Sequence, residues 1–125
     1  MNVPSGLKYS NEHEWVKLDS DIATVGITDY AQSQLGDIVF VDIQTEGETL
    51  AQGEEFGAIE AVKTVAGAFM PISGEIVEVN LSLESNPEAV NIDPYGEGWL
   101  IRIKAADLSE LDNLMDAEQY LAYIS

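Results

Sequence analysis

Short apolar runs separated by turn residues recur along the chain and predict a mostly β structure. Runs of about four to eight residues that are rich in β-branched or aromatic side chains are typical of strands. Asp19-Ser20-Asp21 joins the first two runs into a predicted hairpin. The predicted strands lie within Tyr9–Leu18, Ile22–Ile27, Ile38–Ile43, both halves of Phe56–Met70, Glu75–Asn80 and Trp99–Lys104.

One of these runs, Ile38–Ile43, is almost continuously apolar. A continuous run indicates a strand that is buried on both faces, whereas an alternating run indicates burial on one face. We therefore expect residues 38–43 to form a central strand of a sheet.

Helix-end signals frame three short helical segments. Thr28 is a typical N-cap and Gly36 a typical stop, which predicts a helix of about two turns between them. Near the C-terminus, Ser109 can cap one helical turn, and Asp116 with Gln119 forms a capping-box pattern for another. The segment from residue 82 to residue 94 contains Asn-Pro and Asp-Pro and is predicted to be irregular.

Lys63 lies at the predicted tip of the hairpin formed by Phe56–Met70. A tight hairpin turn usually requires Gly, Asn or Asp, so the β-branched Val62 beside the lysine conflicts with the local rule. Such conflicts are enriched at functional sites. Lys63 is also the only basic residue between Lys17 and Arg102, a segment that holds sixteen of the chain's 23 Asp and Glu residues. The alternative is an ordinary solvated loop lysine.

The length of 125 residues is that of one domain, which we expect to span residues 1–125. No apolar run is long enough to cross a bilayer, and the first residues lack a secretory or transit pattern. We therefore expect a cytoplasmic protein of bacterial type, or a mitochondrial matrix protein if the sequence is a mature eukaryotic form.

The formal net charge of −18 argues against binding to nucleic acid or to anionic lipid. It favours partners with basic docking faces, although an acidic surface also simply keeps a protein soluble. The absence of cysteine excludes disulfides, thiol redox pairs and cysteine-based metal sites. With His13 as the only histidine, a zinc site or a Ser-His-Asp triad is not expected.

The position predicted for Lys63 suits a lysine that a second enzyme acylates. A lysine that acts as a base or forms a Schiff base needs burial to lower its pKa, and an exposed tip among acids has the opposite effect. Acylation by another enzyme needs exposure, a turn and a rigid scaffold. A prosthetic arm attached there would bring the redox sulfur that the sequence lacks.

The chain resembles the glycine cleavage system H proteins over nearly its whole length. Five blocks in the same order carry this resemblance, which makes it far more specific than a lone lysine motif. The blocks are His13-Glu14-Trp15, Val25–Gln32 with Leu35–Val39, Glu60-Ala61-Val62-Lys63, Pro71–Asn80, and Asn91–Tyr95 with Gly98-Trp99.

The resemblance implies a lipoyl-like hybrid barrel-sandwich of two antiparallel sheets, with a short internal helix and C-terminal helices. It also implies lipoic acid in amide linkage to Lys63 and a non-catalytic role as a monomeric carrier of an aminomethyl group. The implied partners are the pyridoxal-phosphate glycine decarboxylase (P protein), the tetrahydrofolate-dependent aminomethyltransferase (T protein), dihydrolipoamide dehydrogenase (L protein) and a lipoate-attaching enzyme.

The sequence departs from the family pattern beside the predicted attachment site. Gly67 stands where the family commonly has an acidic residue, so a carboxylate near the arm is missing. Glu12 and Glu14 are candidate substitutes that could face the ammonium group of a loaded arm. The alternative is that both are solvated acids at a strand edge. Trp15 and Trp99 are expected to be anchors of the core or its rim rather than contacts of the arm.

Two related classes of protein and one functionally unrelated class are alternatives to the hypothesis of an aminomethyl carrier. Biotin carriers resemble one another in having Met on both sides of the lysine, where this chain has Val62 and Thr64. Lipoyl modules of 2-oxoacid dehydrogenase complexes are shorter and are followed by flexible linkers. The third alternative is an unmodified binding protein that keeps the fold and acts in lipoate relay or scaffolding.

Overall fold

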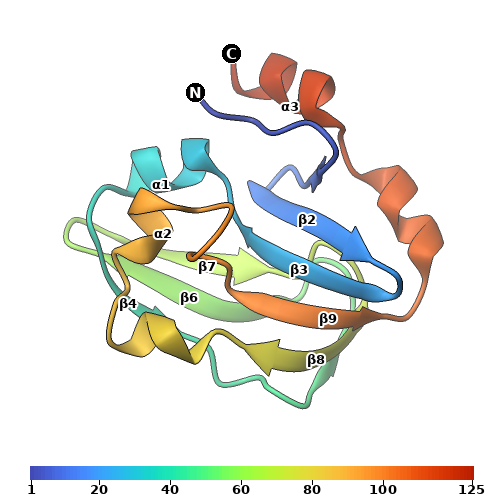
Figure 1. The fold of residues 1–125 in the computed structure, drawn as a ribbon, viewed down its shortest axis with the longest axis horizontal. Coiled ribbons are helices and arrows are strands. Elements are labelled where there is room, and N and C mark those ends of the chain that lie inside the picture. Colours follow the sequence, from blue (N-terminus) through green and yellow to red (C-terminus); the bar gives the residue numbers. More distant parts are fainter.

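The computed structural model describes all residues from Met1 to Ser125, and it contains two antiparallel sheets with helices at their rim (Figure 1). The larger sheet has six strands in the order β1-β2-β3-β9-β8-β5, and the smaller has three in the order β4-β6-β7. This arrangement confirms the predicted mainly β fold with two antiparallel sheets, a short internal helix and C-terminal helices.

The element bounds follow the predicted pattern in most places. The strands of the larger sheet are β1 (Lys8–Tyr9), β2 (Glu14–Asp19), β3 (Ile22–Ile27), β9 (Ile101–Ala105), β8 (Gly74–Val79) and β5 (Thr49–Leu50). Those of the smaller sheet are β4 (Ile38–Asp42), β6 (Glu55–Ala61) and β7 (Val65–Phe69). The helices are α1 (Asp29–Leu35), α2 (Ala89–Ile92), α3 (Ala117–Ile124) and two 3₁₀ helices, Leu81–Glu84 and Leu108–Asn113. None of these helices has the length and apolar composition needed to cross a membrane.

One core of 18 buried residues joins the two sheets. Val25 and Ile103 enter it from the larger sheet, and Ile59 and Ala68 enter it from the smaller one. Burial of these apolar side chains is the main favourable contribution to folding. The core therefore fixes the smaller sheet, and with it the β6–β7 turn, relative to the larger sheet.

A second, aromatic cluster attaches the C-terminal helix to the larger sheet. Tyr120 of α3 stacks on Tyr9 with ring centroids 4.8 Å apart, and Trp15 completes the cluster. The indole N–H of Trp15 donates to the backbone oxygen of Pro94 at 3.0 Å. Trp15 is therefore an anchor of the core, as predicted. The N- and C-termini lie on the same side of the molecule (Figure 1).

The prediction that Ile38–Ile43 forms a central strand buried on both faces is wrong. β4 is an edge strand of the smaller sheet, and Val39 and Phe40 are 50% and 46% exposed. Its pairing with β6 shifts register between Ile38 and Phe40. Such a bulge adds a residue to one strand and changes which side chains face the core, so an apolar run here does not mean burial on both faces.

The helix-end predictions are confirmed at Thr28, at Gly36 and at the Asp116–Gln119 capping box, and wrong at Ser109. The prediction of an irregular segment from residue 82 to residue 94 is wrong in part. Thr28 accepts the N–H of Ala31 at 3.1 Å, and Asp116 and Gln119 form the reciprocal capping box. The first C-terminal helical turn, however, is capped by Asp107 and not by Ser109, because its carboxylate accepts the N–H of residue 109 at 3.0 Å. The segment predicted to be irregular contains α2 and the end of a 3₁₀ helix, which bury apolar side chains in the core.

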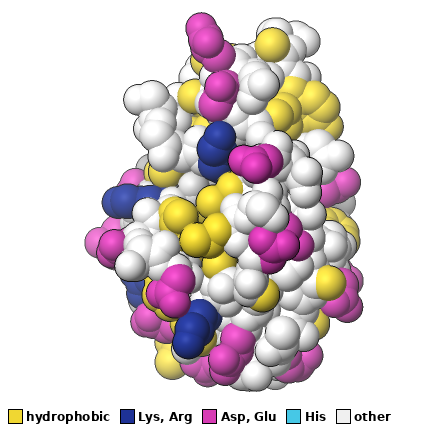
Figure 2. Space-filling model, turned by 90° about the vertical axis from the view of Figure 1, so that its right-hand side faces the viewer, with side chains coloured by type: hydrophobic (Ala, Val, Ile, Leu, Met, Phe, Trp, Pro, Cys, Tyr) yellow, Lys and Arg dark blue, Asp and Glu magenta, His cyan; other side chains and the backbone are white.

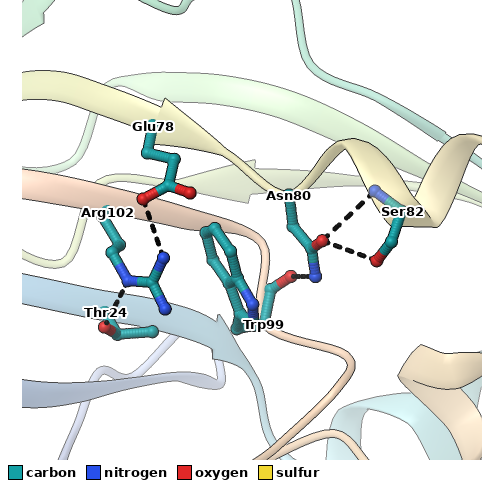
Figure 3. A network of polar contacts seen from close by, with 6 residues as sticks. All are labelled: Thr24, Glu78, Asn80, Ser82, Trp99 and Arg102. Carbon is teal, nitrogen blue, oxygen red and sulfur yellow. Dashed lines mark hydrogen bonds and ion pairs between the residues drawn. The ribbon is translucent and has the colours of Figure 1, made fainter.

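Trp99 lies just before β9, beside Arg102 and Asn80 (Figure 3), and packs against the aromatic cluster. The guanidinium carbon of Arg102 lies 3.9 Å from the Trp99 ring centroid, and Arg102 also pairs with Glu78 at 2.7 Å. The side-chain amide of Asn80 donates to the backbone oxygen of Trp99 at 2.8 Å. These contacts hold the side chain at the rim of the core.

Candidate functional site

Lys63 lies at the centre of the turn that joins β6 to β7, as predicted. The turn is closed by the N–H of Ala61, which donates to the oxygen of Thr64 at 2.8 Å, and it is tied to the start of β4 by a 3.0 Å bond from Val62 N–H to Asp37 O. His13 and Ser20 are the only non-glycine residues with positive φ. The expected backbone conflict at Val62 is therefore absent, because this turn does not use left-handed residues.

The Lys63 amine is exposed and has no hydrogen-bond or ion-pair partner in the structure. Its side chain lies over Gly36, where an added Cβ would stand 3.5 Å from the lysine Cε and 3.9 Å from Nζ. Gly36 has a φ of 80°, which favours glycine at this position. The end of α1 therefore presents bare backbone beneath the lysine.

Asn91 of α2 supports the neighbourhood of the turn, and sequence reasoning assigned it no role. Its side-chain amide donates to the oxygen of Gly36 at 2.8 Å and to Gln32 Oε1 at 3.0 Å. Its Oδ1 accepts the N–H of Ile38 at 2.9 Å. One amide thus joins the end of α1 to the start of β4, and this long-range arrangement leaves no local signal in the sequence.

The four other basic residues lie on the larger sheet, in β1, β2 and β9. Figure 2 views the side of the molecule away from the β6–β7 turn, and Lys and Arg side chains are seen there among acidic ones. Lys63 therefore stands apart from the other cations in space as well as in sequence.

A cavity of about 400 Å³ lies between α1, β2 and β7. Gln34 and Leu35, which directly precede Gly36, form part of its wall, so the cavity begins beside Lys63. A second cavity of about 540 Å³ adjoins it, and both are lined by Glu12, Glu14 and Phe69. Together they form a hollow that leads from the lysine turn to the two predicted carboxylates.

Glu14 is buried in the wall of this hollow and is only 1% exposed. Its Oε1 accepts the hydroxyl of Ser10 at 2.6 Å, and its Oε2 accepts the backbone N–H of Phe69 at 3.2 Å. Burial raises the pKa of the Glu14 carboxyl to about 7, although these two hydrogen bonds oppose the shift. The alternative reading of Glu14 as a solvated acid at a strand edge is therefore wrong.

Glu12 is exposed at the mouth of the same hollow. Its backbone N–H donates to Ser10 Oγ at 3.3 Å, and the backbone N–H of Glu14 donates to the same oxygen at 3.0 Å. Ser10 thus organises the loop that carries both carboxylates. Sequence reasoning missed Ser10, because only the folded loop shows its hydroxyl directed at a buried carboxyl.

His13 has a structural role beside this loop. Its Nδ1 lies 2.8 Å from the hydroxyl of Tyr120, and its ring packs against Tyr30 and Tyr123. Burial lowers the pKa of His13, which favours the neutral imidazole. No three His, Asp or Glu side chains are gathered as a metal site would require.

Comparison with known proteins identifies the family to which the chain belongs. The family model described as "Glycine cleavage H-protein" matches residues 7–125. The glycine cleavage system H protein of Bacteroides fragilis is 64% identical over 125 residues, covering 100% of this chain and 99% of that protein. That of Symbiobacterium thermophilum is 53% identical over 122 residues, covering 98% of this chain and 95% of that protein.

A solved structure agrees with the sequence comparisons. The crystal structure of a glycine cleavage system H protein from Mycobacterium marinum superposes with a TM-score of 0.88 at 36% identity, covering 96% of this chain and 97% of that chain. The resemblance seen in the sequence blocks is therefore confirmed by the whole chain and by the fold. This chain belongs to the glycine cleavage H-protein family.

Proposed function

We propose that this chain is the lipoyl-bearing carrier of the glycine cleavage system, a single non-catalytic domain with Lys63 as the attachment residue. The observation that carries the proposal is an exposed, unpaired amine at the tip of a two-stranded turn, beside a hollow lined by carboxylates. Family membership supports the carrier role in glycine cleavage.

The residues around Lys63 fit a lipoyl amide. The amine has no partner to lose, so acylation breaks no contact, and the missing side chain at Gly36 leaves room beneath the linkage. When attached, lipoic acid supplies the sulfur on which the aminomethyl group is carried. The chain itself supplies a rigid turn, which presents the arm to other active sites. It also supplies a hollow that shields the aminomethyl group, called the cargo below, from water.

Glu14 and Glu12 are the residues that we propose to hold the cargo's ammonium group. A buried carboxyl with a pKa near 7 changes to its ionised form when a cation approaches, because the opposite charge offsets the cost of burial. Ser10 and the Phe69 N–H fix the position of the Glu14 carboxylate before the cargo arrives. Glu12 at the mouth adds a second, solvated negative charge.

The proposed partners are the P protein, the T protein, dihydrolipoamide dehydrogenase and a lipoate-attaching enzyme. We propose that the chain binds them as a monomer in the cytoplasm. A net charge of −18 favours basic docking faces on these enzymes and predicts association that weakens with added salt.

Intact mass after co-expression with a lipoate ligase and lipoate tests the proposal. We expect an increment of one lipoyl amide on the wild type, retained in Lys17→Arg and lost in Lys63→Arg, which keeps the charge of the turn but offers no acylable amine. No increment on the wild type, under conditions that modify another H protein, would reject the proposal in favour of an unmodified binding protein.

A further inference from the structure

The backbone of Gly67 in β7 borders the cavity beside Lys63, and a neighbouring carboxyl covers the glycine. A Cβ at Gly67 would stand 2.5 Å from Oε1 and 3.3 Å from Cδ of Glu55. The carboxyl of Glu55 therefore occupies the space into which a side chain at residue 67 would project. The space of the acidic side chain that is missing at residue 67 is therefore filled by the carboxyl of Glu55, which belongs to the adjacent strand β6.

Phe69 links Glu55 to the buried carboxylate of the site. Glu55 is the cross-strand partner of Phe69 at the start of β6, and the ring Cζ of Phe69 lies 3.0 Å from the same Cβ position at Gly67. The backbone N–H of Phe69 donates to Glu14 Oε2 at 3.2 Å. Directly opposed residues on adjacent strands lie close together, so Glu55 and Glu14 both adjoin Phe69, which lines both cavities.

The Glu55 carboxylate has no hydrogen-bond donor or ion-pair partner, and it is exposed. Glu54 differs, because its Oε1 accepts the backbone N–H of Ala51 at 2.7 Å. Lys63 is the only basic residue between Lys17 and Arg102 in the sequence, and Arg102 is paired with Glu78. Glu55 is thus a carboxylate with free acceptor capacity that covers Gly67, and Gly67 lines the cavity beside Lys63.

We infer that Glu55, reaching over Gly67, supplies a further carboxylate that binds the ammonium group of the cargo. This inference rests on the proposed carrier function and names a contact residue of the same site. The ligand class is a small primary ammonium carried on an uncharged arm. An exposed carboxylate–ammonium pair changes an equilibrium by about two- to fivefold, and this is the effect expected for Glu55.

The first test uses two matched variants, Glu55→Gln and Glu54→Gln, which remove the same charge from adjacent residues. After lipoylation and loading, the half-life of the aminomethyl group in partner-free buffer is followed by intact mass. We expect about a two- to fivefold shorter half-life for Glu55→Gln and no change for Glu54→Gln. Equal half-lives for Glu55→Gln and the wild type would overturn the inference.

A swap of the two positions provides the second test. Glu55→Gly alone shortens the half-life, and Gly67→Asp added to it restores the half-life by placing a carboxylate in the vacated space. A double variant no better than Glu55→Gly would contradict the inference. Amide spectra of each variant, recorded first, confirm that the β6–β7 pairing is retained.

Titration of the unmodified protein with methylammonium chloride separates this inference from the proposed function. At constant ionic strength against sodium chloride, the Gly67 and Phe69 amide signals should shift in the wild type and Glu54→Gln and shift less in Glu55→Gln. Absence of lipoylation with a normal titration would reject the carrier function alone. Identical titrations for all three proteins would reject the role of Glu55 alone.

Discussion

The hydroxyl of Ser10 donates a 2.6 Å hydrogen bond to Oε1 of Glu14 and accepts the backbone N–H of the same glutamate at 3.0 Å. The two bonds close a ring around the first residue of β2. A buried carboxyl needs such donors, because an unsatisfied one loses the hydration it had in water. The position of the Glu14 carboxyl, and with it the proposed cargo site, therefore depends on an uncharged serine.

Replacing Ser10 by Ala removes this donor, and we expect the free energy of unfolding to fall by about 1–3 kcal/mol. The loss should be larger at pH 8 than at pH 5, because the ionised form of Glu14 depends more on its donors. Urea unfolding at both pH values measures it. Ser85→Ala, whose hydroxyl makes only an exposed 3.4 Å contact, is the control; equal losses in the two variants would refute this role.

Glu14→Gln should remove a pH dependence of stability. The folded-state pKa of about 7 lies above the ordinary value of 4.5, so between these values the folded wild type holds more protons than the unfolded chain. Wild-type stability therefore falls as the pH rises through this window, by up to about 3 kcal/mol. The neutral glutamine lacks this change. A difference in unfolding free energy between the two proteins that stays flat from pH 4.5 to pH 7 would show that Glu14 is not buried as described.

The hydroxyl of Tyr120 connects α3 to the loop and to α1. It lies 2.8 Å from His13 Nδ1 and 2.7 Å from Thr28 Oγ1. Tyr120→Phe keeps the stacking on Tyr9 but leaves His13 and Thr28 without this hydrogen-bond partner. We expect the free energy of unfolding, measured by heat or urea, to fall by about 1–2 kcal/mol. Tyr123→Phe, which loses an exposed bond, should cost less than about 0.5 kcal/mol. Similar losses in both would mean that the Tyr120 hydroxyl links nothing of importance.

Gly26 is required by the packing of Trp15. A Cβ at residue 26 would stand 2.7 Å from the indole nitrogen, which is too close for an unshifted ring. Gly26→Ala should therefore destabilise the protein by about 1–3 kcal/mol, and indole fluorescence should report the displaced ring. The smaller ring of Trp15→Phe should relieve the clash, so the two substitutions combined should cost less than the sum of the single ones. Strict additivity would argue against this contact.

Several parts of the fold and site follow from residues that are near one another in sequence. The Thr28 cap, the Asp116–Gln119 capping box and the lysine turn between two strands were all predictable, because each depends on side chains within one turn or one hairpin. The edge position of β4 was not predictable, since an apolar run does not reveal a bulge or how many strands a sheet contains. The 3₁₀ helix Leu81–Glu84 and α2 were missed, because each has only four residues and is too short to show a periodic apolar pattern.

The sequence by itself determined the family, the class of fold and the isolated lysine. Periodicity and turn chemistry depend on residues close together in the chain, and the five blocks can be read directly in their order along it. Only the tertiary structure decided that Glu14 is buried and held by Phe69, 55 residues away, and that Glu55 covers Gly67. These contacts depend on strand register and on how the two sheets pack. Register and packing are set by the whole core at once, so no single stretch of the chain contains them.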